Sequence, residues 1–147
     1  MVRKIEFEFE RGGKFVAELL EVEAPETCKY ICDKLPITYR VRQSTISGET
    51  LGINLDGWDF KKLENSNTMV PPGELGFLTT HIPHTPETKL YCQILFAYGP
   101  NQIHQMWGRA SPTNRFAKTV EGTVKELRDV ATRIHEKGRE NVTIKIK

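Results

Sequence analysis

Apolar and polar residues alternate over several short segments of the chain. Segments 5–10 and 15–19 show this alternation, and Gly12-Gly13 lies between them. A period of two on either side of a glycine turn is typical of a β-hairpin. The same alternation returns at 37–42 and 51–55, which predicts a second hairpin.

Two other segments have the helical period instead. Pro25 stands where a first helical residue is favoured, and Pro36 limits the run. The apolar positions between the two prolines fall at i, i+3, i+4 and i+7: Cys28, Ile31, Cys32 and Leu35. Thr123 and Glu126 form a capping-box pattern that opens a second helix, and Gly138 ends it.

The rest of the chain contains further strands and two long irregular segments. Strands are predicted at Gly76–Thr80, Leu90–Tyr98, Arg115–Val120 and near the end of the chain, at 142–146. Between them, 56–72 and 101–113 are rich in Gly, Asn, Ser and Pro and show no period. Connections of this length usually carry a function, so both segments are candidates for a site.

Many short strands with one early and one late helix favour a mainly β fold. The expected architecture is a closed β-barrel whose open ends are plugged by the two helices. A chain of 147 residues is expected to form a single domain over 1–147. At this length the chain buries roughly 68–70% of the surface that its unfolded form exposes, so it needs no metal or disulfide to fold.

Charge and cysteine usage narrow the class of protein. The 21 Lys and Arg against 19 Asp and Glu give a formal charge of +2, with the two signs interleaved along the chain. Nucleic-acid and membrane-surface proteins concentrate basic charge on one face, so neither partner is expected. Three cysteines and the absence of an apolar signal-peptide run at the start predict a reduced, cytoplasmic protein.

Particular segments also resemble a known family. Residues 17–35, AELLEVEAPETCKYICDKL, and 115–135, RFAKTVEGTVKELRDVATRIH, are similar to the opening and closing parts of cyclophilins, and the final strand NVTIKIK follows in the same order. The middle, with GELGF at 73–77 and LYCQILFAYG at 90–99, resembles the small bacterial and archaeal cyclophilin-like proteins, including the DUF3830 group. The resemblance implies a cyclophilin-like closed barrel.

Cyclophilins are peptidyl-prolyl isomerases, and the resemblance transfers part of their site. Thr38-Tyr39-Arg40-Val41 stands where that family has Phe-His-Arg-Val, which implies that Arg40 is the catalytic residue and engages the amide before proline. Gln93 begins a segment that matches the family's Gln-Phe-Phe strand. The Gln-Gly-Gly-Asp segment of the family has no counterpart, because 44–55 reads differently. A diverged isomerase is therefore one hypothesis.

The spacing of two arginines suggests anion binding independently of the resemblance. Arg40 and Arg42 are two residues apart in a predicted strand, so they share one face. Two guanidinium groups on one face can bind a carboxylate or phosphate through paired hydrogen bonds. The alternative is a solvated face whose arginines pair with Glu6, Glu8 and Glu10 of the first strand.

Aromatic and basic residues gather in or next to the irregular segments. They are Trp58, Tyr98, His104, Met106, Trp107 and Arg109. Such residues at loop ends can form a ligand cleft or a subunit contact. The alternative is that each ring packs over an end of the barrel.

Histidines and cysteines give weaker candidates. His81, His84 and His104 could supply three imidazoles for a zinc or iron enzyme, although loop histidines are more often ordinary surface residues. Cys28 and Cys32 are expected to be small core residues of the first helix. No metal and no cofactor is expected.

The leading functional hypothesis is a module that binds a small molecule or a peptide in a cleft on the barrel. Its site would combine Arg40 with these ligand-binding residues: Tyr39, Arg42, Trp58, Gln93, Tyr98, His104, Trp107 and Arg109. The alternatives are a diverged peptidyl-prolyl isomerase and a histidine-based metal-dependent enzyme. Exposed strands are expected to permit pairing between subunits, which predicts a homo-oligomer as a further partner class.

Overall fold

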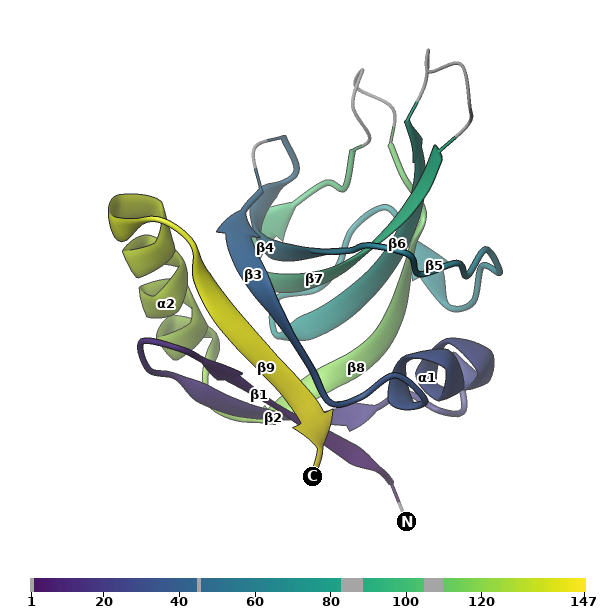
Figure 1. Ribbon diagram of the computed structural model, residues 1–147, viewed down its shortest axis with the longest axis horizontal. Coiled ribbons are helices and arrows are strands. Elements are labelled where there is room, and N and C mark those ends of the chain that lie inside the picture. Colours follow the sequence, from purple (N-terminus) through teal and green to yellow (C-terminus); the bar gives the residue numbers. More distant parts are fainter. Residues whose placement is uncertain (1, 45, 83–88, 105–109) are drawn as a thin grey trace.

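A computed structural model describes residues 2–44, 46–82, 89–104 and 110–147, with the side chains of 80–82 and 89–91 left undescribed (Figure 1). Nine strands and two helices make up the described part. The strands are β1 (Lys4–Phe9), β2 (Lys14–Leu19), β3 (Ile37–Gln43), β4 (Gly48–Leu55), β5 (Ser66–Asn67), β6 (Glu74–Ile82), β7 (Lys89–Asn101), β8 (Thr113–Glu121) and β9 (Glu140–Ile146). The helices are α1 (Pro25–Cys32) and α2 (Val124–Lys137).

Eight of these strands close into an antiparallel barrel. Their order is β2-β1-β9-β3-β4-β7-β6-β8, and β2 pairs with β8 to close the ring. The short β5 lies outside the ring and pairs with the start of β8. The predicted mainly β, closed-barrel fold with two helices is therefore confirmed.

Aromatic side chains fill the inside of the barrel. The ring of Phe7 stacks on Phe15 at a centroid distance of 5.1 Å and contacts Phe96 at 5.1 Å. All three rings are at most 1% exposed, as the inward positions of alternating strands should be. The barrel is therefore a packed core.

The two helices cover opposite sides of this barrel, as Figure 1 shows. Cys28 and Ile31 of α1 and Leu127 and Ile134 of α2 are at most 3% exposed and belong to the same core cluster as the barrel rings. The apolar stripe of each helix is thus buried against the barrel, in agreement with the sequence-based expectation. Neither described helix combines the length and apolar character required to cross a bilayer.

Some boundaries differ from the sequence-based prediction. α1 ends at Cys32, three residues before the predicted end at Leu35. β6 continues to Ile82 instead of ending at Thr80, because its last residues stay in register with the start of β7. Backbone pairing between the two adjacent strands thus continues as far as the pair Ile82 and Lys89.

The carboxylate of Glu64 is one of the groups that attach the long segment 56–72 to the rest of the protein. Glu64 accepts hydrogen bonds from the backbone N–H of Glu26 at 3.2 Å and from the N–H and hydroxyl of Thr27, each at 2.8 Å. Burial raises the pKa of Glu64, but these hydrogen bonds together lower it by more than burial raises it. The pKa of Glu64 therefore lies below its ordinary value. An acidic side chain thus accepts hydrogen bonds from the free backbone N–H groups at the N-terminus of α1, where negative charge is favourable.

Candidate functional site: a groove between diverging strands

β3 and β4 separate along part of their length. β3 pairs with β9 from Ile37 to Val41, but with β4 only from Val41 to Gln43. β4 follows β7 instead, as far as Leu55. The divergence of the two strands is visible in Figure 1.

A shallow cavity of about 280 Å³ lies where these strands diverge. Its lining comes from β3, from the end of β4 and from the residue before β9: Tyr39, Arg40, Arg42, Asn54, Asp56 and Arg139. We call this cavity the β3–β4 groove. The sequence-predicted residues Tyr39, Arg40 and Arg42 therefore lie together, on the strand where the alternation placed them.

Two hydrogen bonds orient the arginines of the groove. Nη2 of Arg40 donates to the backbone carbonyl of Arg139 at 3.2 Å. Nη2 of Arg42 donates to Oδ1 of Asn54, also at 3.2 Å. Val41, between the two arginines, is fully buried, so the arginines occupy the outer face of the barrel.

The groove has more positive than negative charge. Its lining contains three guanidinium groups and one carboxylate, that of Asp56. Among the described residues, no ion pair joins Arg40 or Arg139 to a carboxylate. The groove thus gathers positive charge on a protein whose formal charge is only +2.

The pairing of Arg40 with the glutamates of β1, which the alternative interpretation expected, is not found in the described part of the chain. β9 lies between β1 and β3, so Arg40 stands opposite Asn141. The carboxylate of Glu6 pairs with Lys14 at 3.0 Å and Lys145 at 3.1 Å. Glu10 accepts a hydrogen bond from the backbone N–H of Asn141 at 2.9 Å.

Gln93 lies one strand away from the groove. In the register of β4 and β7 it stands opposite Asn54, and it is 6% exposed. It therefore lies beside the groove lining, on the same face of the sheet and in the same row as Asn54. The structure brings Gln93 near the predicted arginines without placing it in the cavity wall.

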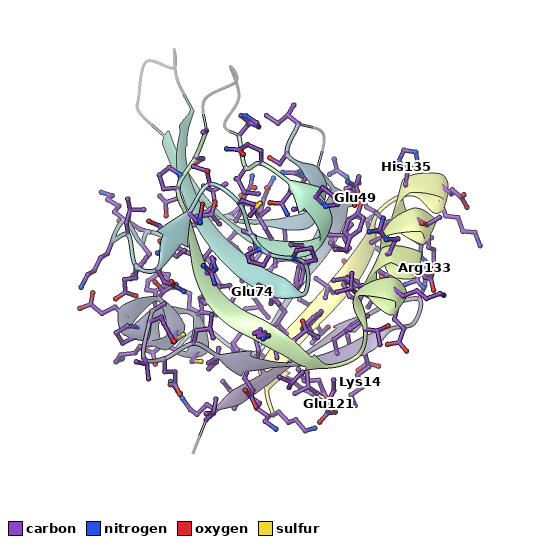
Figure 2. The ribbon with its side chains drawn as sticks, turned by 180° about the vertical axis from the view of Figure 1, so that it is seen from behind. Lys14, Glu49, Glu74, Glu121, Arg133 and His135 are labelled. Atoms are coloured by element: carbon purple, nitrogen blue, oxygen red, sulfur yellow. The ribbon has the colours of Figure 1, made fainter. Side chains whose placement is uncertain are left out.

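Tyr98 occupies a separate position beneath α2. Its hydroxyl donates to Oε1 of Gln43 at 2.5 Å, and its carbonyl accepts from Nη2 of Arg128 at 3.0 Å. Burial raises the pKa of the Tyr98 hydroxyl, and Glu49, visible beside α2 in Figure 2, acts in the same direction. Tyr98 is thus an interior residue that is absent from the groove lining.

Trp58 packs into the protein core. Its ring lies 5.7 Å from that of Tyr30 and 6.2 Å from that of Phe77, between centroids. Its carbonyl accepts a hydrogen bond from Sγ of Cys92 at 3.4 Å. This placement agrees with the alternative in which the ring packs over an end of the barrel.

Of the remaining candidates, the described part of the chain includes His104, which is absent from the groove lining. The backbone N–H of His104 donates to Oγ of Ser47 at 3.1 Å. Met106, Trp107, Arg109 and His84 lie outside the described residues, as does the side chain of His81. Over the described part of the chain, no three His, Cys, Asp or Glu side chains are arranged to hold a metal.

Both cysteines of α1 pack against the core. Cys28 is fully buried, and its Sγ donates to the carbonyl of Phe116 at 3.4 Å. Burial raises the pKa of the Cys28 thiol to about 12, and it also raises the pKa of Cys32. The thiolate is the reactive form, so burial disfavours reaction at both thiols. Cys28 is a core residue, as expected, and Cys32 is partly buried against the core.

Cys28 should therefore resist alkylation in the folded protein. With iodoacetamide at pH 8, we expect mass spectrometry to find the Cys28 peptide unmodified under native conditions and fully modified in concentrated urea. Cys32, which is partly exposed, serves as the internal comparison. Native labelling of Cys28 as fast as that of a free peptide would contradict this packing.

Two groove residues, Asn54 and Arg139, were missed by the sequence analysis, and Asp56 was noted only as a weak candidate acid next to Trp58. Asn54 and Asp56 continue the outward positions of the second predicted hairpin, so the period of two contained a signal for them. Arg139 gave no such signal. Only the pairing of β9 with β3 brings it beside Arg40, 99 residues away in the sequence.

Comparisons with known proteins agree with the observed fold. A family model described as a protein of unknown function (DUF3830) matches residues 9–146. No curated protein matches the chain. The chain is similar to the structure of McbB in complex with tryptophan, with a TM-score of 0.71, 16% identity, and coverage of 97% of this chain and 44% of that chain.

A second solved structure matches over the whole length of the chain. The solution structure of the hypothetical protein AF2241 from Archaeoglobus fulgidus has a TM-score of 0.64 and 22% identity, covering 99% of this chain and 95% of that one. The chain therefore spans less than half of McbB and nearly all of AF2241. At these identities the likeness is one of fold.

Proposed function

This chain belongs to the DUF3830 family of proteins of unknown function, and we propose that it binds a small anionic molecule in the β3–β4 groove. The observation that carries the proposal is the meeting of three guanidinium groups in one cavity. The ligand would be a small molecule, or a peptide end, that carries a carboxylate or phosphate.

The geometry of Arg40 supports this proposal. Its hydrogen bond to the carbonyl of Arg139 holds the guanidinium beside a second arginine. A guanidinium has five N–H donors, so Arg40 keeps donors for a ligand oxygen after that bond is made. Carboxylate and phosphate oxygens match these donors in pairs, which gives both affinity and orientation.

The size of the groove limits the ligand. A cavity of about 280 Å³ is near the lower end of the roughly 300–1,000 Å³ range of small-molecule pockets. The ligand should therefore be no larger than a single metabolite-sized molecule. The fold neighbour McbB, whose structure is a complex with tryptophan, supports a ligand of this size.

A thermal-shift experiment tests the proposal. Citrate, benzoate and phenyl phosphate should be added at matched ionic strength. At ten times Kd an anion stabilises the protein by about 1.4 kcal/mol, a rise in Tm of roughly 3–6 °C. We expect at least one of them to raise Tm in the parent and none in Arg40→Ala.

Arg3→Ala is the matched control, because it removes one exposed arginine that pairs with Glu21 outside the groove. It should keep the response to the anion. An equal rise in Tm in the parent and Arg40→Ala would reject the groove as the site, and no rise with any of the three anions would reject the proposed class of ligand.

Peptidyl-prolyl isomerisation is the second candidate, favoured by the position of Tyr39 next to Arg40 in the groove. The described lining contains one aromatic ring, whereas holding a twisted proline amide away from water calls for an apolar surface. A proline-isomerisation assay separates the two functions. Catalysis by the parent that disappears in Arg40→Ala would favour the isomerase.

A further inference from the structure

The charges of the groove are arranged along its length. In the register of β3 and β9, Val41 stands opposite Glu140, so Arg139 lies level with Arg42. In the register of β3 and β4, Val41 stands opposite Ile53. Extending this register by one residue places Asn54 opposite Arg40. Asp56 lies two residues farther along the chain than Asn54.

The guanidinium groups gather toward one end of this arrangement. Arg42 and Arg139 occupy the same level, and Nη2 of Arg40 reaches the carbonyl of Arg139 at 3.2 Å. Arg40 is thus directed away from the end where Asp56 lies. Two residues of a strand span about 7 Å, so the positions of Arg40 and Asp56 are about 7 Å apart along the strand direction.

We propose that the ligand of the groove is a small zwitterion, with its carboxylate at the arginine end and its protonated amine at Asp56. This inference rests on the proposed anion-binding function and specifies its class of ligand. A purely anionic ligand would make no favourable contact with Asp56, and like charges at close range repel. An ammonium group a few ångströms from the carboxylate would instead use both ends of the groove.

Asn54 fits the same arrangement. Its Oδ1 accepts the hydrogen bond from Nη2 of Arg42 at 3.2 Å, and it lies between the arginine end and Asp56. The side-chain amide therefore separates the positive and negative parts of the lining. A short carbon skeleton that joins a carboxylate to an amine would cross this middle position.

Matched ligand triplets test the inference. The first is tryptophan, indole-3-propionate and tryptamine, and the second is 4-aminobutanoate, butanoate and butylamine. Within each triplet the carbon skeleton stays similar while the charged groups change. The zwitterion is thus compared with a ligand that carries only the carboxylate and with one that carries only the amine. NMR titration measures Kd down to weak affinities and shows whether the amides of Arg40, Asp56 and Arg139 shift.

We expect at least one zwitterion to bind about two- to fivefold more tightly than its deaminated carboxylate, as one solvent-accessible ion pair would provide. In Asp56→Asn the zwitterion should lose this advantage, while the carboxylate binds as well as before. Arg40→Ala should weaken both. Asp59→Asn is the control, because Asp59 is an exposed carboxylate of the same segment that pairs with Lys61.

Two results would overturn the proposal that the ligand is a zwitterion. One is equal affinity of zwitterion and carboxylate in both triplets, and the other is an advantage that persists in Asp56→Asn. After either result, the anion-binding proposal still stands if Arg40→Ala weakens the binding of the carboxylates. If no carboxylate binds the parent, the anion-binding function itself fails.

Discussion

Phe7→Ala should destabilise the protein by about 3–5 kcal/mol, the usual cost of deleting a fully buried aromatic ring. Phe7 contacts three other rings, those of Phe9, Phe15 and Phe96, at centroid distances of 5.1 to 6.1 Å. Removing it leaves a void in the barrel that the β1–β2 and β7 strands cannot close. For a domain of this size we expect Tm to fall by roughly 6–20 °C.

Urea unfolding followed by circular dichroism measures this change. Val120→Ala is the control, since Val120 is an apolar strand residue that is 43% exposed, and its truncation should change the free energy of unfolding by no more than about 0.5 kcal/mol. A loss for Phe7→Ala as small as that of the control would contradict the packed barrel core.

Glu140→Gln should destabilise the protein by about 2–3 kcal/mol at pH 7. Its carboxylate is 1% exposed and forms ion pairs with Arg133 at 2.8 Å and Arg11 at 3.1 Å. Removing one partner of a buried pair typically costs 3–5 kcal/mol, and the partial exposure of both arginines reduces that figure. Arg133 projects from α2 (Figure 2), so the carboxylate connects that helix to the β1–β2 hairpin.

The pH dependence gives a sharper test of Glu140. Burial raises its pKa, but hydrogen bonds from Arg133 and from the N–H of Arg11 outweigh burial and leave the pKa lowered. A lowered pKa in the folded state adds stability above the unfolded pKa, and this stability is lost as pH falls through the folded value. The difference between the parent and Glu140→Gln should therefore shrink from pH 7 toward pH 3.

Glu121→Gln is the matched control for that comparison. Glu121 pairs with Lys147 at 3.5 Å, but both side chains are about half exposed, and such pairs contribute at most about 1 kcal/mol. A difference between the parent and Glu140→Gln that stays constant from pH 7 to pH 3 would show that the carboxylate charge is not the source of the stability.

Local patterns in the sequence predicted most of the strands and both helices. The period of two in Ile37–Gln43 correctly placed Arg40 and Arg42 on one face and Val41 in the core. The capping box at Thr123 and Glu126 is present, with both of its hydrogen bonds formed. These features depend on residues close in the sequence, which is why a linear pattern reveals them.

Pairing between distant segments was beyond the reach of such patterns. The sequence suggested Trp58 as a ligand contact because it lies in a segment without a period, yet α1 and β6 supply the rings that bury it. The same holds for Glu64, whose partners on α1 are 37 and 38 residues away. Neither contact has a local signature.

The sequence by itself determined a mainly β barrel with two helices, and it placed two arginines together on an outer face. Side-chain periods and caps are local consequences of backbone geometry, so they can be read directly from the order of residues. The tertiary structure alone decided that β4 leaves β3 beyond Ile53, the partner of Val41, and that Arg139 lies beside Arg40 there. Strand order and divergence depend on the packing of the whole barrel, and that packing has no local sequence pattern.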